Sequence, residues 1–399
     1  MRIRSVKIQL CFVHRTPFRE TQSAHTDRIT QFNVIWQRVS IRMRIASVGT
    51  AYPPNRYPQA IITEALRTRW QDRLPEPRLI NRLHANCGVE YRYTVFPLQT
   101  YADLSGFGPT NDAWITAALD LGQKSITSAL DRVGLTPADI SAIFFASVTG
   151  ISSPTIDARL INRMPFPVNI KRTPIFGLGC VAGAAGISRA ADYVRAFPKQ
   201  YALLLSVELC SLTWQDNDQS IANLVSCGLF GDGSAAVVIA GAETPLVQSP
   251  NGHKPGPRIL DTRSTFYHNT EHIMGWDIGN LGFKIVLSPD VPKVVHEHLK
   301  GNVDSFLADN GLRAEDISSY IFHSGGPKVL EAMETTLNLP PDALAPSWKS
   351  LREVGNLSAA SVLAVLEDVL SNSPGKPGSY SILAAMGPAF CSELVLLQW

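Results

Sequence analysis

Residues 177–194 read GLGCVAGAAGISRAADYV, and this stretch decides how the rest of the chain is interpreted. It opens with a Gly-Leu-Gly turn, places Cys180 directly after it, and continues through alanines and glycines into a segment typical of a helix. A cysteine at a helix N-terminus lies at the positive end of the helix dipole, which favours thiolate over thiol. Free cysteines are also among the residues most often buried. The stretch therefore predicts a close-packed central helix that carries either a nucleophile or a buried structural cysteine.

The composition is that of an ordinary globular chain. Of its 399 residues, 45% are hydrophobic and 18% are charged, and the formal net charge is +2. This balance gives no electrostatic reason to expect nucleic acid as a partner. The six cysteines are far apart and include no C-x-x-C pair, which favours neither a zinc site nor a disulfide framework and indicates a reducing, cytoplasmic compartment. No apolar run reaches the roughly 18 residues of a spanning helix, so no membrane insertion is expected.

The first 42 residues differ in composition from those that follow. They contain eight basic residues and only two acidic ones, without the continuous apolar segment of a secretory signal. A transit peptide has such a composition, but a strand-like run, RIASVGTA, begins at Arg44 immediately after Met43. We therefore predict that residues 1–42 are a disordered extension or not part of the native chain, and that the folded protein begins at Met43.

Strands and helices alternate through the rest of the chain, which is typical of an α/β fold. Apolar runs predict buried strands at 44–51, 140–148, 170–178, 201–208, 233–240, 259–266, 317–323, 380–385 and 391–398. Helices are predicted at 55–70, 77–87, 111–133, 152–164, 180–194, 290–310, 325–337 and 356–370. A helix rich in small residues occurs twice, at 180–194 and 356–370. The pattern predicts an internal duplication into halves 43–250 and 251–399, linked by a proline-rich segment, each contributing one buried helix to a shared centre.

Two further polar residues stand where one element meets another. His323 ends an apolar strand before Ser-Gly-Gly-Pro, and Asn356 lies at a helix start. Taken singly, a histidine at a strand end is more often structural, and an asparagine before a helix is most often its N-cap. Together with Cys180 they supply a nucleophile, a base and a hydrogen-bond donor, which are complementary parts of a covalent catalytic site.

Five short motifs follow one another along the chain: GLGCVAGAAG at the cysteine, LFGDGSAAVVI, FHSGGPKVL at the histidine, GNLSAAS at the asparagine, and MGPAF near the C-terminus. Through these motifs the chain from about Arg44 to Trp399 resembles the type III polyketide synthases, the chalcone-synthase-like group, and specifically their bacterial branch. The FGDGSA segment alone is shared across the wider thiolase superfamily, so the ordered set carries the resemblance. It implies a thiolase-like αβαβα layered fold of two similar halves, and a homodimer.

The resemblance also implies roles for individual residues. It implies Cys180, His323 and Asn356 as the catalytic group, and a cavity lined by Phe230, Phe283, Thr213, Cys210 and Ser358, with Gly387 near the acyl oxygen. Met274 and Trp276 fall in a region that shapes the volume of this cavity. Cys210 stands where plant members usually carry threonine, which argues against a flavonoid-type starter. Arg78 and Arg82, one helical turn apart, are candidates for binding the phosphates of CoA because guanidinium matches phosphate geometry, although a solvated helix face is the more usual explanation of such arginines.

Together these residues predict an acyltransferase that loads an acyl-CoA starter on Cys180, condenses it with malonyl-CoA by decarboxylation, and cyclises the product to an α-pyrone or a resorcinol. No cofactor or metal is implied beyond the CoA thioester substrates. Two alternatives stay open: a ketoacyl-acyl carrier protein synthase III of fatty-acid initiation, which uses the same residue types, and a catalytically silent dimer partner. The pairs His268 with His272 and His296 with His298 are better explained without a metal.

Overall fold

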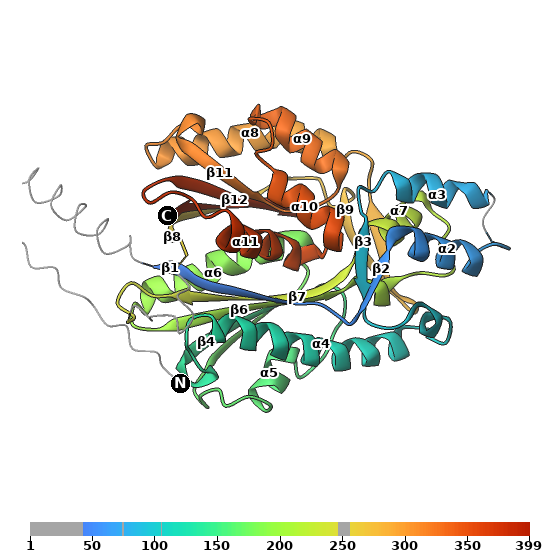
Figure 1. Cartoon of the computed structure of the whole chain (residues 1–399), viewed down its shortest axis with the longest axis horizontal. Coiled ribbons are helices and arrows are strands. Elements are labelled where there is room, and N and C mark those ends of the chain that lie inside the picture. The colour runs from blue at the N-terminus through green and yellow to red at the C-terminus, as the bar shows by residue number, and fades with distance from the viewer. Residues whose placement is uncertain (1–42, 74–75, 105, 246–255) are drawn as a thin grey trace, which may run out of the picture. The chain divides into compact units, whose positions relative to one another are not determined.

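The computed structural model describes residues 43–73, 76–104, 106–245 and 256–399 (Figure 1). The prediction for residues 1–42 lies outside these ranges, as does most of the predicted connector between the halves. Within the described ranges, the principal sheet has nine strands in the order β11-β12-β13-β8-β1-β7-β6-β4-β5. Its two parts meet only where Arg44 of β1 pairs with Arg258 of β8.

The first part of the sheet is built by the N-terminal half. Its strands are β1 (Arg44–Ala51), β4 (Ile140–Ala146), β5 (Lys171–Ile175), β6 (Tyr201–Leu209) and β7 (Asp232–Ala240). Strand β6 lies between β4, which is parallel to it, and β7, which is antiparallel. All nine residues of β6 are buried, as a continuous apolar run predicts for a strand covered on both faces.

The second part repeats this arrangement with the C-terminal half. Its strands are β8 (Arg258–Phe266), β11 (Ile317–Phe322), β12 (Tyr380–Gly387) and β13 (Cys391–Gln398). Strand β12 is parallel to β11 and antiparallel to β13, so β11-β12-β13-β8 matches β4-β6-β7-β1 in order and direction.

Helices form three layers around the two parts of the sheet (Figure 1). The outer layers are α4 (Phe107–Asp131) with α5 (Ile156–Ile161), and α8 (Val291–Asp309) with α9 (Pro327–Leu337). The central layer holds α6 (Ala182–Ala196) and α11 (Ser361–Asn372), which contact strands of both parts. A Cβ on Gly183 would lie 2.2 Å from the carbonyl oxygen of Ala359, so the small residues of α6 are required for this close packing. The predicted five-layered α/β fold is confirmed.

Several predicted elements differ in extent or were missed. The predicted helix over 55–70 is wrong in its first turn, because β2 (Asn55–Pro58) pairs with β3 (Tyr91–Thr94) and α2 (Gln59–Arg69) begins only afterwards. The helix predicted at 152–164 is limited to α5. Elements without a sequence prediction are α7 (Ile221–Leu229), β9 (Met274–Gly279), β10 (Gly282–Leu287) and α10 (Ala345–Val354). The predicted helix at 77–87 is α3 (Pro77–Ala85). No helix of the described residues is long and apolar enough to span a membrane.

Candidate active site

Cys180 lies in a tight turn held by glycines. It occupies the middle of a single 3₁₀ turn, Gly179–Val181, that leads directly into α6. Gly179 has φ +52°, a left-handed conformation, and a Cβ there would lie 2.7 Å from Cδ of Pro388. A Cβ on Gly387 would likewise lie 2.7 Å from the carbonyl oxygen of Leu178. The closing turn between β12 and β13 is thus pressed against the cysteine turn, and both contacts require glycine.

Asn356 and Ser358 face the cysteine from the second half of the chain. The Oγ atom of Ser358 lies 3.7 Å from Sγ of Cys180. Asn356 Oδ1 accepts a hydrogen bond from the backbone N–H of Ser358 (2.8 Å) and one from the hydroxyl of Ser361 (3.2 Å). Its Nδ2 donates to the carbonyl oxygen of Gly325 at 3.1 Å, which leaves the second amide hydrogen available. Asn356 is therefore held as a donor, not as a simple helix cap.

His323 follows β11 directly and is buried. Its backbone N–H donates to Ala384 at 2.9 Å, which fixes the end of β11 against β12. A Cβ on Gly325 would lie 3.4 Å from Nε2 of His323, so the glycine that accepts from Asn356 also borders the imidazole. Among the described residues, Nδ1 of His323 has no hydrogen-bond partner. Cys180 is thus connected to Asn356 through Ser358, and Asn356 to His323 through Gly325.

Burial shifts the pKa values of Cys180 and His323. It raises the pKa of Cys180 to about 12, although hydrogen bonds from the side chains of Ser358 and Asn356 lower it. Burial alone lowers the pKa of His323 to about 4. Both shifts favour the uncharged forms, a thiol at Cys180 and a neutral imidazole at His323. Desolvation of the sulfur thus opposes the thiolate that a helix N-terminus was expected to favour.

Phe230 and Cys210 lie in the same apolar cluster as Cys180. Phe230 forms an isolated parallel bridge with Asn356: the N–H of Asn356 donates to Leu229 and that of Gly231 donates to Asn356, each at 2.9 Å. Cys210 and Thr213 bound a 3₁₀ turn after β6, and the Thr213 hydroxyl donates to the carbonyl oxygen of Cys210 at 2.8 Å. Two of the predicted lining residues, Phe230 and Cys210, thus lie in one apolar cluster with Cys180, and Thr213 is joined to Cys210 by a hydrogen bond. Their role as cavity lining stays a prediction.

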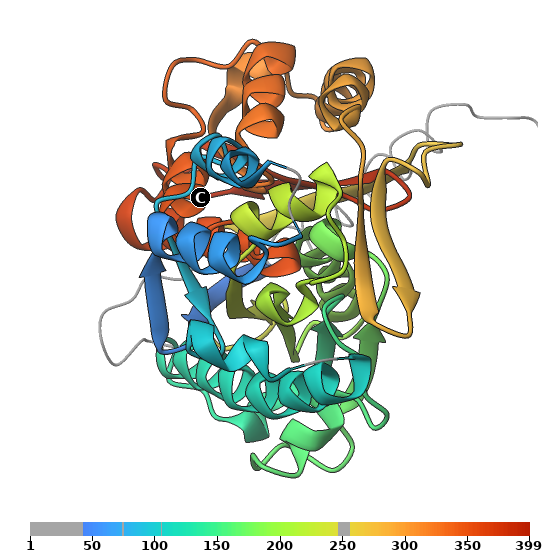
Figure 2. The same cartoon turned by 90° about the vertical axis from the view of Figure 1, so that its right-hand side faces the viewer.

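Phe283 belongs to a separate two-stranded sheet, β9–β10, which stands at the side of the molecule in Figure 2. Its buried ring packs edge-to-face on Phe107 and Trp276, with centroids 5.8 and 6.0 Å apart. Met274 and Trp276 lie on the partner strand β9 and are half-buried. The position of Phe283 therefore depends on how this hairpin is held.

Two buried charged residues beside the site were missed by sequence reasoning. Glu208, at the end of β6, accepts a hydrogen bond from the hydroxyl of Thr149 at 2.9 Å, and burial raises its pKa to about 7. Arg92, fully buried on β3, donates to the carbonyl oxygen of Phe230 at 2.6 Å and to Gln59 at 3.0 Å. No motif marks Arg92, since its role follows only from the pairing of β2 with β3.

The remaining sequence candidates lie away from this cluster. Arg78 and Arg82 are exposed on α3. His296 Nδ1 lies 2.7 Å from the hydroxyl oxygen of Thr336, and the ring of His298 stacks on Tyr267 at 4.4 Å. Within the described residues, no group of three or more histidine, cysteine or acidic side chains is arranged to hold a metal ion.

Comparison with known proteins places the whole described region in one family. Residues 33–244 match the N-terminal domain of chalcone and stilbene synthases, and residues 259–398 match the C-terminal domain. A 1,3,6,8-tetrahydroxynaphthalene synthase of Streptomyces peucetius subsp. caesius is 47% identical over 89% of this chain and 93% of its own length. A phloroglucinol synthase of Pseudomonas fluorescens is 29% identical over 87% of this chain and 97% of its own length.

A solved structure agrees with this assignment. The crystal structure of 1,3,6,8-tetrahydroxynaphthalene synthase from Streptomyces coelicolor A3(2), a bacterial type III polyketide synthase, superposes with a TM-score of 0.82 and 32% identity, covering 89% of this chain and 99% of that one. The fold, both family matches and these relatives agree over nearly the same residues. The chain therefore belongs to the chalcone and stilbene synthase family and is an acyl-transferring type III polyketide synthase of the bacterial branch.

Proposed function

We propose that Cys180 carries the growing acyl chain, that His323 accepts and returns its proton, and that Asn356 stabilises the oxyanion formed when malonyl-CoA loses carbon dioxide. The supporting observation is that Ser358 and Gly325 connect the three side chains within one buried cluster. A nucleophile, a base and an amide donor in such a cluster fit acyl transfer.

Loading begins from the neutral pair. As Sγ of Cys180 attacks the thioester carbon of an acyl-CoA, its proton passes to the imidazole of His323, whose lowered pKa leaves it unprotonated at neutral pH. The C–S bond to CoA then breaks, and the CoA thiolate takes the proton from the imidazolium. The acyl group remains as a thioester on Cys180, and His323 is neutral again for the next step.

Extension uses the same residues. When malonyl-CoA loses carbon dioxide, the electron pair of the broken C–C bond moves onto the thioester oxygen, where the free amide hydrogen of Asn356 and the N–H of His323 can donate to it. The enolate carbon then attacks the Cys180 thioester, and the Cys180 thiolate leaves. Phe230 and Phe283 provide buried apolar surface that disfavours the charged carboxylate and promotes its departure.

The product proposed for this chain is a polyhydroxylated aromatic ring, with tetrahydroxynaphthalene as the first candidate. This candidate replaces the α-pyrone or resorcinol of the sequence prediction, for which the two relatives described above give no support. It is supported by relatives named for tetrahydroxynaphthalene and phloroglucinol. A naphthalene skeleton can be assembled from malonyl units alone, which makes malonyl-CoA both starter and extender.

We also propose that the enzyme acts as a homodimer on CoA thioesters. Strand β5 is an edge of the sheet, and its residues Lys171–Pro174 are exposed. Exposed Val168 and Phe176 flank this edge, and exposed apolar side chains beside an uncovered strand are typical of an association surface. Arg78 and Arg82 remain candidates for the CoA phosphates because both guanidinium groups are accessible on α3.

The experiment is incubation of the purified enzyme with malonyl-CoA alone, and with malonyl-CoA plus a panel of acyl-CoA starters, followed by mass spectrometry. We expect release of carbon dioxide and one dominant aromatic product from malonyl-CoA alone. A pyrone or resorcinol formed only with added starter would replace the naphthalene proposal. Activity of Cys180→Ala equal to that of the wild type would refute the assignment of the nucleophile.

A further inference from the structure

The β9–β10 hairpin must be held in place by contacts other than the backbone pairing of its own two strands. Among the described strands, β9 and β10 pair only with each other and not with the nine-stranded sheet. Phe283 on β10 is nevertheless buried, whereas Ile278 and Leu281 near the hairpin tip are about half exposed. The position of the Phe283 ring is therefore set by side-chain contacts to other elements.

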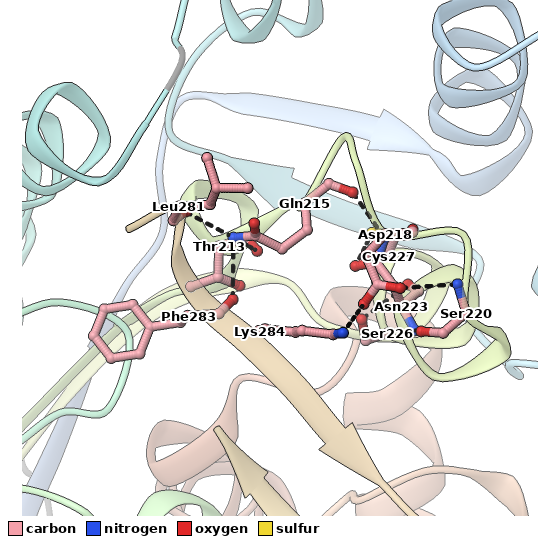
Figure 3. Close-up of polar contacts among 10 residues, drawn as sticks. All are labelled: Thr213, Gln215, Asp218, Ser220, Asn223, Ser226, Cys227, Leu281, Phe283 and Lys284. Carbon is pink, nitrogen blue, oxygen red and sulfur yellow. Dashed lines mark hydrogen bonds and ion pairs between the residues drawn. The ribbon is translucent and has the colours of Figure 1, made fainter. Parts of the chain in front are cut away.

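Gln215 provides such contacts with a single carboxamide. Its Nε2 atom donates to the carbonyl oxygens of Leu281 at 3.0 Å and Phe283 at 3.2 Å, and lies 3.4 Å from that of Thr213 (Figure 3). All three partners are acceptors, so only the NH₂ group of the amide fits this position. Gln215 is 9% exposed, which makes its loss of hydrogen bonds costly. One side chain thus ties β10 to the turn that carries Thr213.

The segment that carries Gln215 is itself braced. Asn223 of α7 donates from Nδ2 to the carbonyl oxygens of Gln215 at 2.9 Å and Asp218 at 2.6 Å. The Asp218 carboxylate accepts from the N–H of Ser220 at 2.9 Å and lies 4.0 Å from Nζ of Lys284, the residue after Phe283 (Figure 3). Lys284 is largely exposed, so this ion pair contributes little, and the Gln215 carboxamide is the main fastening.

Gln215 also borders a surface cavity. A cavity of about 630 Å³ is lined by Gln215, Asp218 and the hairpin residues 277–282. Phe283 does not line this cavity, and its ring packs on Phe107 and Trp276 instead. Loss of the carboxamide would therefore free β10 toward a space already open to solvent.

We propose that Gln215 is a positioning residue for the polyketide reaction: by fastening β10 to the Thr213 turn, it sets the place of Phe283 in the cavity wall and thereby the chain length at which the product is released. This inference rests on the proposed role of Phe283 as a lining residue. Gln215 touches neither Cys180 nor its partners, so its effect is on product distribution and not on the chemistry of the bond-forming step.

The test compares four variants with the wild type: Gln215→Met, which keeps the size but removes the donors; Gln215→Glu, which replaces donors by an anion; Phe283→Ala as the positive reference; and Asp277→Asn as the matched control. Asp277 is exposed on β9 and has no side-chain hydrogen bond or ion pair among the described residues. The readouts are carbon dioxide release, the ratio of products by length, and hydrogen exchange of residues 274–287.

For Gln215→Met we expect carbon dioxide release within about threefold of the wild type, and hydrogen exchange of the hairpin about tenfold faster, since two ordinary hydrogen bonds are lost. The product ratio should shift at least about threefold in the same direction as for Phe283→Ala. In Gln215→Glu the ratio should return toward that of the wild type as the pH falls, because a protonated carboxyl can donate again. Asp277→Asn should match the wild type.

A lower rate with an unchanged product ratio in Gln215→Met, or no pH response of the ratio in Gln215→Glu, would overturn the inference and leave Gln215 a purely structural residue. If Gln215→Met does not fold, the pH response of Gln215→Glu decides alone. Unchanged products in Phe283→Ala would instead refute the proposed role of Phe283. The two failures can be told apart, because faster hydrogen exchange of residues 274–287 in Gln215→Met would still show that Gln215 holds the hairpin in place.

Discussion

The two halves of the molecule use the same turn for different purposes. In the first half, Gly179–Val181 forms a 3₁₀ turn that leads into α6, and in the second half Ser358–Ala360 forms one that leads into α11. The first residue of each turn has a positive φ, +52° for Gly179 and 49° for Ser358. Cys180 therefore corresponds to Ala359, and only the first half presents a nucleophile.

The difference lies in what presses on each turn. Pro388 approaches Gly179 so closely that no side chain fits, whereas the second turn has room for the side chain of Ser358. The left-handed conformation of Ser358 is supported by its N–H bond to Asn356, and its hydroxyl reaches Sγ of Cys180. One turn carries the reactive atom, and the corresponding turn of the second half supplies groups close to it.

The largest effect that we expect is a loss of rate when Asn356, which lies in the second half near Cys180 of the first, is substituted. Asn356→Ala removes an oxyanion donor, and we expect carbon dioxide release from malonyl-CoA to fall about 10²–10³-fold. Asn372→Ala, at the exposed far end of α11, is the matched control and should retain the wild-type rate. Equal losses in both variants would mean that the amide of Asn356 has no specific role in decarboxylation.

A smaller effect is expected on stability, where substitutions in the Gly179 turn and in the Ser358 turn should differ. Gly179→Ala places a Cβ at positive φ and against Pro388, so the free energy of unfolding should fall by about 1–3 kcal/mol or more. Ser358→Gly relieves the same conformation, and its free energy of unfolding should stay within about 1 kcal/mol of the wild type. Urea unfolding of both variants checks this. Similar large losses would show that the two turns are constrained alike.

The smallest effect expected is on the pH dependence of stability. The pKa of His323 is lowered from 6.5 to about 4, so the unfolded chain binds a proton here that the folded chain does not, and stability is lost as the pH falls through this window. The pKa of Glu208 is raised from 4.5 to about 7, so its contribution is present at low pH and lost as the pH rises.

Variants at these two positions should therefore act in opposite directions. In urea unfolding at about pH 5 and pH 7.5, His323→Gln should show a smaller acid-induced loss of stability than the wild type, and Glu208→Gln a larger one. If both variants followed the wild-type profile, burial would not be setting the protonation of these groups.

Much of this architecture could be predicted from the sequence because its core consists of continuous apolar runs. The fully buried strands β6 and β7 and the small-residue helices α6 and α11 all leave strong local signals. The positions of Cys180, His323 and Asn356 followed from the same runs, since each residue ends or begins one. Their catalytic roles remain predictions to be tested.

The parts that could not be predicted depend on contacts distant in the chain. The hairpin β9–β10 consists of two short six-residue strands, of which β9 is half-buried to exposed, and it is held by Gln215, more than sixty residues away, so local propensity does not reveal it. Arg92 of β3 bonds to Phe230, which lies 138 residues away in the chain. The raised pKa of Cys180 follows from its burial in the folded chain, which a helix-dipole argument on one segment cannot include.

The most direct test of the central claim is to find which sulfur carries the acyl group. The enzyme would be quenched during turnover with malonyl-CoA, digested, and its cysteine peptides weighed by mass spectrometry. We predict acyl mass on the peptide that contains Cys180 and none on those with Cys87, Cys210, Cys227 or Cys391. Acylation of another cysteine, or of none in an enzyme that still forms product, would contradict the account.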